Sequence, residues 1–171
     1  MQFKMNMKLL SGKSGYLLGF IACFAIVVLA LVIQTNNQLE PCPLCITQRI
    51  IFMSLGILFL IAAFIPPQHI LKKVLALLQV LTAMGGMGVA IRHWYLQAHH
   101  EEMIADCGVG FDYMFENFPL EKAFKLLFRG TGDCATIDWT FLGLTLPQLA
   151  LISFIGFAIY AIWLLKGSKH A

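Results

Sequence analysis

Four long apolar stretches are the feature that most constrains how this chain can fold. They cover residues 16–33, 46–65, 74–91 and 144–165, each about 18–22 residues long. A helix needs about 20 apolar residues to cross the roughly 30 Å of hydrocarbon in a bilayer. Because a backbone in lipid must satisfy its own hydrogen bonds, each stretch is predicted to form a membrane-spanning helix.

The composition of the chain agrees with a membrane protein. Of its 171 residues, 59% are hydrophobic and only 12% are charged, about half the charge of a typical soluble domain. We therefore predict one all-α domain over residues 1–171, a four-transmembrane-helix bundle with loops at 34–45 and 93–143. The net charge of +3 comes from lysines near the helix ends. No basic patch with interleaved aromatic residues indicates a nucleic-acid partner.

The lysines also predict the orientation of the bundle. Basic residues without acidic neighbours flank three ends of the predicted helices: residues 4–13, 72–73 and 166–169. The nine acidic residues all fall in the other two loops. The positive-inside rule then places both termini and the 66–73 turn in the cytoplasm, and loops 34–45 and 93–143 outside. Within the longer loop, Phe124, Leu127 and Phe128 have helical spacing between basic residues, which predicts a short amphipathic helix on the membrane surface.

Cys42 and Cys45 form a Cys-x-x-Cys pair at the start of the second apolar stretch. Such a pair closes too small a loop to restrict the unfolded chain much, so it favours electron exchange over stapling a fold. Cys107 and Cys134 lie in the second outer loop, whereas Cys23 lies in the first stretch and is expected to be a small apolar core residue.

Three interpretations of the four outer cysteines remain open. They can form two structural disulfides, and proximity in the sequence favours the pairs Cys42–Cys45 and Cys107–Cys134. They can form a four-cysteine zinc centre, with His99 or His100 as other possible ligands. They can also form a redox relay, which the oxidising outer side of a membrane and the spacing of the first pair favour.

Two polar residues near the predicted outer membrane surface are candidate site residues. Arg49 follows Cys45 by four residues, so on a helix the two share a face. Its positive charge, together with the helix N-terminus, would favour a thiolate or another anion there. His93 follows the third stretch at the same membrane level. It would be either a solvated helix end or a hydrogen-bond partner for a carbonyl oxygen.

Several motifs together resemble the DsbB family of quinone-linked, disulfide-generating proteins of the bacterial inner membrane. They are Pro41-Cys42-Pro43-Leu44-Cys45 with Gln48-Arg49, His93-Trp94-Tyr95-Leu96-Gln97, Cys107, Gly132-Asp133-Cys134-Ala135, and the block from Trp139 to Gln148. The resemblance covers nearly the whole chain. The last block is long and specific, whereas Cys-x-x-Cys alone would be a weak signal.

The resemblance implies a thiol:quinone oxidoreductase that reoxidises a periplasmic DsbA-like partner. The partner would attack Cys107 of a Cys107–Cys134 disulfide, and the electrons would pass to Cys42 and Cys45. Cys45 would donate them to ubiquinone, or to menaquinone without oxygen. Arg49 would stabilise the anionic quinone and thiolate, and His93 would contact the quinone ring.

Other functions remain as alternatives. A DsbI-like enzyme would serve a dedicated partner. A vitamin-K-epoxide-reductase-like enzyme also uses a four-helix bundle and cysteine pairs, but its active pair lies on the last helix of the bundle, whereas this pair opens the second. A metal-binding or purely structural membrane protein is the non-enzymatic alternative.

Overall fold

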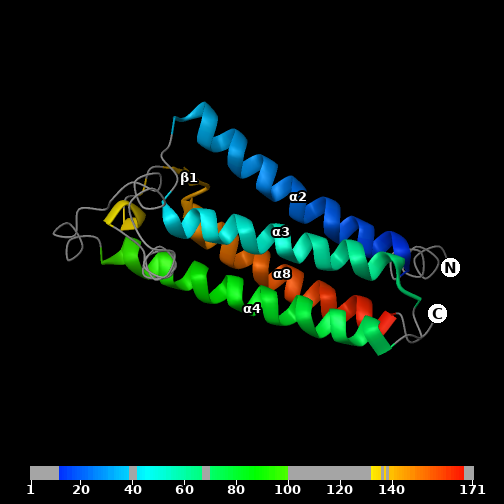
Figure 1. Cartoon of the computed structure of the whole chain (residues 1–171). Helices are drawn as coiled ribbons and strands as arrows, with labels where there is room; N and C mark the ends of the chain where they lie inside the picture. The colour runs from blue at the N-terminus through cyan, green and yellow to red at the C-terminus, as the bar shows by residue number, and fades with distance from the viewer. Residues whose placement is uncertain are drawn as a thin grey trace, which may run out of the picture.

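Four long helices make up most of the structure, a computed structural model that describes residues 12–38, 42–66, 70–99, 132–135, 137 and 139–167. They are α2 (Lys13–Asn36), α3 (Pro43–Phe64), α4 (Ile70–Ala98) and α8 (Leu146–Gly167). Figure 1 shows them side by side in an elongated bundle, in which α3 packs against α2 and α4, and α8 packs against α4. All four are long and apolar enough to cross a membrane, which confirms the predicted four-helix membrane bundle. The amphipathic helix predicted within loop 93–143 lies outside the described residues.

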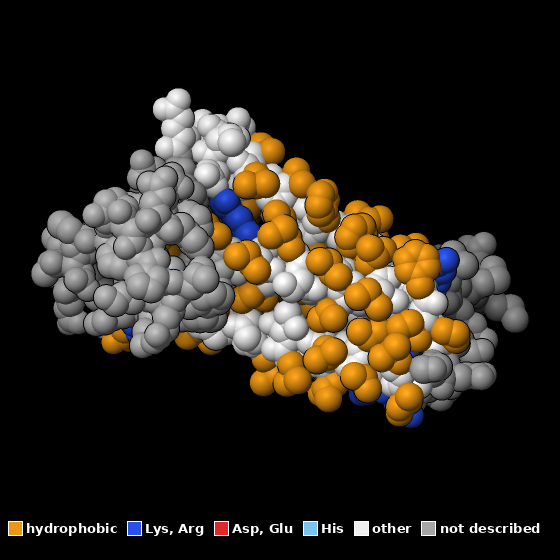
Figure 2. Space-filling view, viewed as in Figure 1, with side chains coloured by type: hydrophobic (Ala, Val, Ile, Leu, Met, Phe, Trp, Pro, Cys, Tyr) orange, Lys and Arg blue, Asp and Glu red, His pale blue; other side chains and the backbone are white. Residues whose placement is uncertain are grey.

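The outer surface of the bundle is apolar along its length. Large hydrophobic side chains such as Phe24, Leu29, Ile57 and Ile159 are exposed on the helices, and Figure 2 shows such side chains covering the long side of the molecule. A soluble protein rarely exposes apolar surface on this scale. The surface therefore suits a lipid environment, as expected of a multi-pass membrane protein.

Local sequence explains where α3 begins and ends. Pro43 occupies the first turn, where its missing N–H is no loss. The Cys42 sulfur caps the helix by accepting a hydrogen bond from the Cys45 backbone N–H at 3.4 Å. At the other end, Ile65 is extended (φ −90°, ψ 133°), the conformation favoured before a proline such as Pro66. These signals place Cys42 and Cys45 in the first turn of a membrane helix.

A small hairpin leads into α8. Strands β1 (Thr140–Phe141) and β2 (Leu144–Thr145) pair antiparallel. Leu142 and Gly143 between them have positive φ values of 53° and 80°, as in the type I′ turns that match strand twist. The short 3-10 helix η1 (Gly132–Ala135) packs against α3 and α4. The hairpin, η1 and the start of α3 thus lie at the same end of the bundle (Figure 1).

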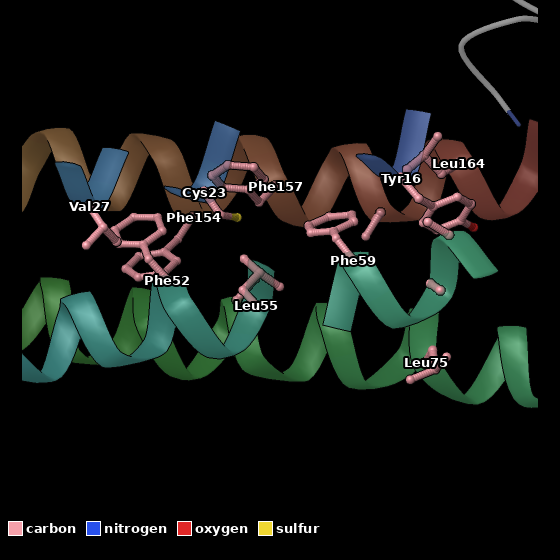
Figure 3. Close-up of a cluster of buried hydrophobic side chains, with 14 of the residues drawn as sticks. Tyr16, Cys23, Val27, Phe52, Leu55, Phe59, Leu75, Phe154, Phe157 and Leu164 are labelled. Atoms are coloured by element: carbon pink, nitrogen blue, oxygen red, sulfur yellow. The ribbon is translucent and has the colours of Figure 1, made fainter. Parts of the chain in front are cut away.

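The core between the helices is rich in aromatic rings (Figure 3). The rings of Phe52 and Phe154 stack with their centroids 4.0 Å apart. Gly86 on α4 permits this contact, because a Cβ there would lie only 2.5 Å from the Phe154 ring. Gly85, by contrast, has open space beside it. Of the two neighbouring glycines, Gly86 is the one that lets α4 and α8 approach closely.

Lys72 has a structural role at the end of the bundle opposite the hairpin and the start of α3. It lies in the first turn of α4, is only 4% exposed, and donates a hydrogen bond from Nζ to the Ile65 carbonyl at 3.2 Å. The same ammonium group lies 4.6 Å from the centroid of the Tyr16 ring. The sequence indicated only that Lys72 marks the orientation, whereas in the structure it also joins α4 to the ends of α2 and α3.

Candidate active site

Three of the predicted redox cysteines meet at the start of α3. Cys42 is 7% exposed and Cys134 is fully buried, and the two belong to one packed cluster with Leu44 and Leu96. The contact arises because η1, which carries Cys134, packs against α3 and α4. Cys42, Cys45 and Cys134 are in the thiol state, with no disulfide formed among them. Cys107, the fourth predicted site cysteine, lies outside the described residues.

The environment of Cys42 favours its neutral thiol. Hydrogen bonds with the side chains of Cys134 and Cys45 raise its pKa well above the usual range, and burial adds to the effect. A negative charge on Cys45 or Cys134 would also repel one on Cys42. In the reduced cluster, Cys42 is therefore expected to keep its proton at neutral pH.

His93 lies against this cluster from α4. It is 2% exposed, and its Nε2 atom is 3.7 Å from the Cys42 sulfur. Its Nδ1 atom is 3.4 Å from the Gln48 side-chain amide. The sequence predicted His93 near the site but did not indicate the partners on its two ring nitrogens. The structure places the imidazole between Gln48 and the redox cysteines.

A cavity of about 610 Å³ opens beside Cys45. Its polar wall includes Cys45, Gln48 and Arg49 from the first turns of α3. Its apolar wall comes from α2, α8 and the hairpin, with residues that include Ile26, Ala30, Ile33, Trp139, Phe141, Leu149 and Ile152. Figure 1 shows α2 leaning away from α3 toward this end of the bundle. Cys45 and Arg49 thus face one cavity, as their spacing predicts, and His93 is not among the residues that line it.

Arg49 is held by a residue that the sequence analysis missed. Its guanidinium donates a short hydrogen bond from Nη1 to the Gln34 side-chain oxygen. The sequence predicts a loop at Gln34, but α2 continues to Asn36. The sequence does contain a signal for this contact, because Gln34 is a polar side chain near the end of an apolar helix.

Two other residues considered in the sequence lie apart from this cluster. Cys23 belongs to the apolar core of the bundle, where its Cβ would lie 3.2 Å from a Cβ placed on Gly56. His99 is exposed, and its ring stacks on Tyr95 with centroids 4.2 Å apart. His100 lies outside the described residues.

The arrangement suits thiol–disulfide exchange. Exchange requires one sulfur to attack another along a line of close contacts. Cys42 contacts both Cys134 and Cys45, and Cys45 lies at the wall of an apolar cavity. Cys42 can therefore exchange a disulfide with either neighbour, and Cys45 is accessible from the cavity.

Comparison with known proteins identifies the family. The model of the family "Disulfide bond formation protein DsbB" matches residues 12–164. A relative from Methylobacillus flagellatus, named Disulfide bond formation protein B, is 54% identical over 157 residues, covering 92% of this chain and 95% of the relative. Proteins of the same name from Methylococcus capsulatus and Azoarcus sp. are 43% and 42% identical, and each alignment covers at least 90% of both chains. The chain therefore belongs to the DsbB family of membrane oxidoreductases that form disulfide bonds.

Proposed function

We propose that the protein reoxidises a DsbA-like periplasmic dithiol oxidase and passes the electrons to membrane quinone. Overall, a partner dithiol and a quinone become a partner disulfide and a quinol, with two electrons and two protons transferred. The observation that carries the proposal is the cavity that has Cys45 and Arg49 in its wall and apolar side chains around them.

The cavity fits a quinone in size and chemistry. Its volume of about 610 Å³ lies within the roughly 300–1,000 Å³ typical of small-molecule sites. The apolar side chains of α2 and α8 suit a ring with an isoprenoid tail, and the Arg49 guanidinium can donate hydrogen bonds to a carbonyl oxygen. A bound ubiquinone, or menaquinone without oxygen, supplies an acceptor for two electrons and two protons. Arg49 would stabilise negative charge on the oxygen and on Cys45.

The contacts among the cysteines support an order of exchange. In the proposed cycle, a thiolate of the reduced partner attacks Cys107 and releases Cys134 as a thiolate. Cys134 then attacks Cys42 of a Cys42–Cys45 disulfide. The Cys42–Cys134 bond would form, and Cys45 would leave as a thiolate beside the cavity. The second thiol of the partner would attack the mixed disulfide, so that the partner leaves oxidised and Cys107 is freed. Cys107 would then attack Cys134 and restore the Cys107–Cys134 disulfide, and Cys42 would close its disulfide with Cys45 as two electrons pass to the acceptor. Cys134 packs against Cys42, which supports the attack of Cys134 on Cys42. His93 would hold Cys42 in position, and Gln48 would orient the His93 ring.

An electron sink in the membrane also follows from redox potentials. A DsbA-type oxidase has a potential of about −120 mV, whereas structural disulfides lie below about −300 mV. An ordinary disulfide therefore cannot reoxidise such a partner. Transfer to a quinone would pull the exchange forward.

The proposed location is the bacterial inner membrane, with both termini in the cytoplasm. The first turn of α2, the first turn of α4 and the last turn of α8 carry Lys13, Lys72 and Lys166. Figure 1 shows these three helix ends at one end of the bundle, opposite the cysteine cluster. By the positive-inside rule this end faces the cytoplasm, so the cluster faces the periplasm and its oxidising partners.

The test is quinone reduction by the purified protein in detergent, with reduced DsbA as the donor and ultraviolet absorbance as the signal. We expect turnover to disappear in Cys45→Ser and to remain near the wild-type rate in the core variant Cys23→Ser. Arg49→Ala should raise the KM for quinone while leaving the KM for DsbA unchanged. Sustained turnover in Cys45→Ser would contradict the proposed electron path.

A further inference from the structure

The cysteine cluster and His93 also have the composition of a metal site. The ligand atoms of Cys42, Cys45 and His93 all lie within 4.8 Å of one another. Cys134 contacts Cys42 in the same buried cluster. Two sulfurs and one imidazole nitrogen therefore converge at the start of α3, and a third sulfur, that of Cys134, lies next to Cys42. Zinc is commonly bound by three cysteines and one histidine.

One distance in the cluster already agrees with tetrahedral coordination, and the others can reach it with a small contraction. With Zn–S bonds of about 2.3 Å and Zn–N bonds of about 2.0–2.1 Å, neighbouring ligand atoms lie roughly 3.6–3.8 Å apart. The separation between the Cys42 sulfur and His93 Nε2 is 3.7 Å. The ligand atoms of Cys42, Cys45 and His93 lie within 4.8 Å of one another, so they need a contraction of up to about 1 Å to reach this geometry. Small side-chain rotations in the first turn of α3 would supply it. Cys134 is not within that group, so its side chain must also turn toward the ion to complete the site.

Gln48 is placed to orient the histidine as a ligand. Metal-binding histidines usually donate their second ring N–H to an oxygen, which fixes the tautomer. The Gln48 amide lies 3.4 Å from His93 Nδ1. Since the oxygen and nitrogen of an amide exchange places by a half-turn, Gln48 can present its oxygen to Nδ1–H. Nε2 then directs a lone pair toward the sulfurs.

We propose that the fully reduced protein binds one zinc ion through Cys42, Cys45, Cys134 and His93, and that the oxidised protein does not. Binding exchanges the thiol protons for the metal, with no change of oxidation state. A disulfide between any two of these cysteines removes two ligands. A bound ion would hold the sulfurs needed for exchange, so zinc would inhibit the reduced enzyme. The binding itself requires neither quinone nor a partner protein, so it can be tested separately from the proposed function.

The experiment is a titration of the reduced, tag-free protein in detergent with Co²⁺, which reports its coordination by absorbance, followed by displacement with Zn²⁺. We expect one equivalent of Co²⁺ with the intense visible bands of a tetrahedral site and a thiolate charge-transfer band. The same protein oxidised beforehand should show neither. An octahedral spectrum, or equal affinity in the oxidised form, would overturn the proposal. This comparison needs no substitution, so it does not depend on any variant folding.

Matched variants identify the ligands. His93→Ala should weaken Zn²⁺ binding by more than the roughly 10–100-fold expected for Gln48→Ala, which removes only the partner of a ligand. His99→Ala, at an exposed position on the same helix, should leave the affinity unchanged. Cys107→Ser should also leave it unchanged, because Cys107 is not among the proposed ligands. A large loss in Cys107→Ser, with none in His93→Ala, would instead identify a four-cysteine centre and refute the assignment of His93.

Discussion

Replacing Gly86 by alanine is expected to destabilise the bundle where α4 meets α8. A Cβ at this position would lie 2.5 Å from Cε1 of Phe154 and 2.6 Å from Cζ. The Phe154 ring is fully buried and stacks on Phe52 at 4.0 Å, so moving it would disturb the stacked pair. The added methyl group must therefore push the two helices apart or displace the stacked rings.

The expected loss of stability in Gly86→Ala can be compared with the effect of the same substitution at the neighbouring Gly85. Overpacking a core by one or a few carbon atoms costs about 1–3 kcal/mol, a roughly 5- to 150-fold change in the unfolding equilibrium. At Gly85 an added Cβ would meet nothing within 4 Å. There, Gly→Ala should be neutral or stabilising by up to about 1 kcal/mol, because alanine favours the helix. The two substitutions have the same chemistry on the same helix, so their difference measures the contact with Phe154.

The assay is reversible unfolding in mixed micelles with increasing sodium dodecyl sulfate, followed by far-ultraviolet circular dichroism. Gly86→Ala should lower the free energy of unfolding, and Gly85→Ala should not. Phe154→Leu removes the clashing ring, so adding it to Gly86→Ala should cost less than the sum of the two single changes. Equal stability of the two alanine variants, or strict additivity in the double variant, would refute the argument.

Three further predictions use the same purified protein. Lys72→Ala should lower the free energy of unfolding by about 1–3 kcal/mol, since it removes a charged hydrogen bond and a cation–π contact. In the same unfolding assay, replacement of the exposed neighbour, Lys73→Ala, should change the free energy of unfolding little. Gln79 is fully buried, and neither polar atom of its side chain has a hydrogen-bond partner in the described structure. Gln79→Met should therefore raise the free energy of unfolding by about 1 kcal/mol. A lower free energy of unfolding would show that the amide is satisfied. Gln34→Ala releases Arg49, so in steady-state quinone reduction it should raise the KM for quinone several-fold, but by less than Arg49→Ala does. An unchanged KM would show that Gln34 does not position Arg49.

Much of the fold could be predicted from apolar length alone, but the extent of the helices could not. Hydropathy marks the part of a helix that contacts lipid. The third apolar stretch was expected to end at residue 91, yet α4 continues to Ala98. Its last two turns include His93 and Trp94, which can remain helical at the membrane interface, where polar and aromatic side chains are favoured. Consequently a residue assigned to a loop, His93, lies buried on a helix instead.

The candidate site shows the same division between local and distant information. The first-turn position of Cys42 and Cys45, and the shared face of Cys45 and Arg49, follow from spacing along one helix. The contacts of Arg49 with Gln34, Gln48 with His93, and His93 with Cys42 join residues 15, 45 and 51 positions apart in the sequence. Such pairs depend on how each helix is rotated about its axis toward its neighbours. A single sequence contains no direct measure of that rotation.

The packing around Cys42 gives the proposed relay a direction. Cys134, carried by η1, packs against Cys42, whereas Cys45 lies one turn further along α3 at the wall of the apolar cavity. Cys42 itself is not among the residues that line the cavity. A quinone there could therefore exchange electrons with Cys45, while the loop cysteine meets Cys42. If the proposed relay is right, its two reactions use different sulfurs, so an aqueous protein and a lipid-soluble acceptor would not need to occupy the same space. One turn of helix would then separate the two substrates, and exchange between Cys42 and Cys45 would carry electrons from one to the other.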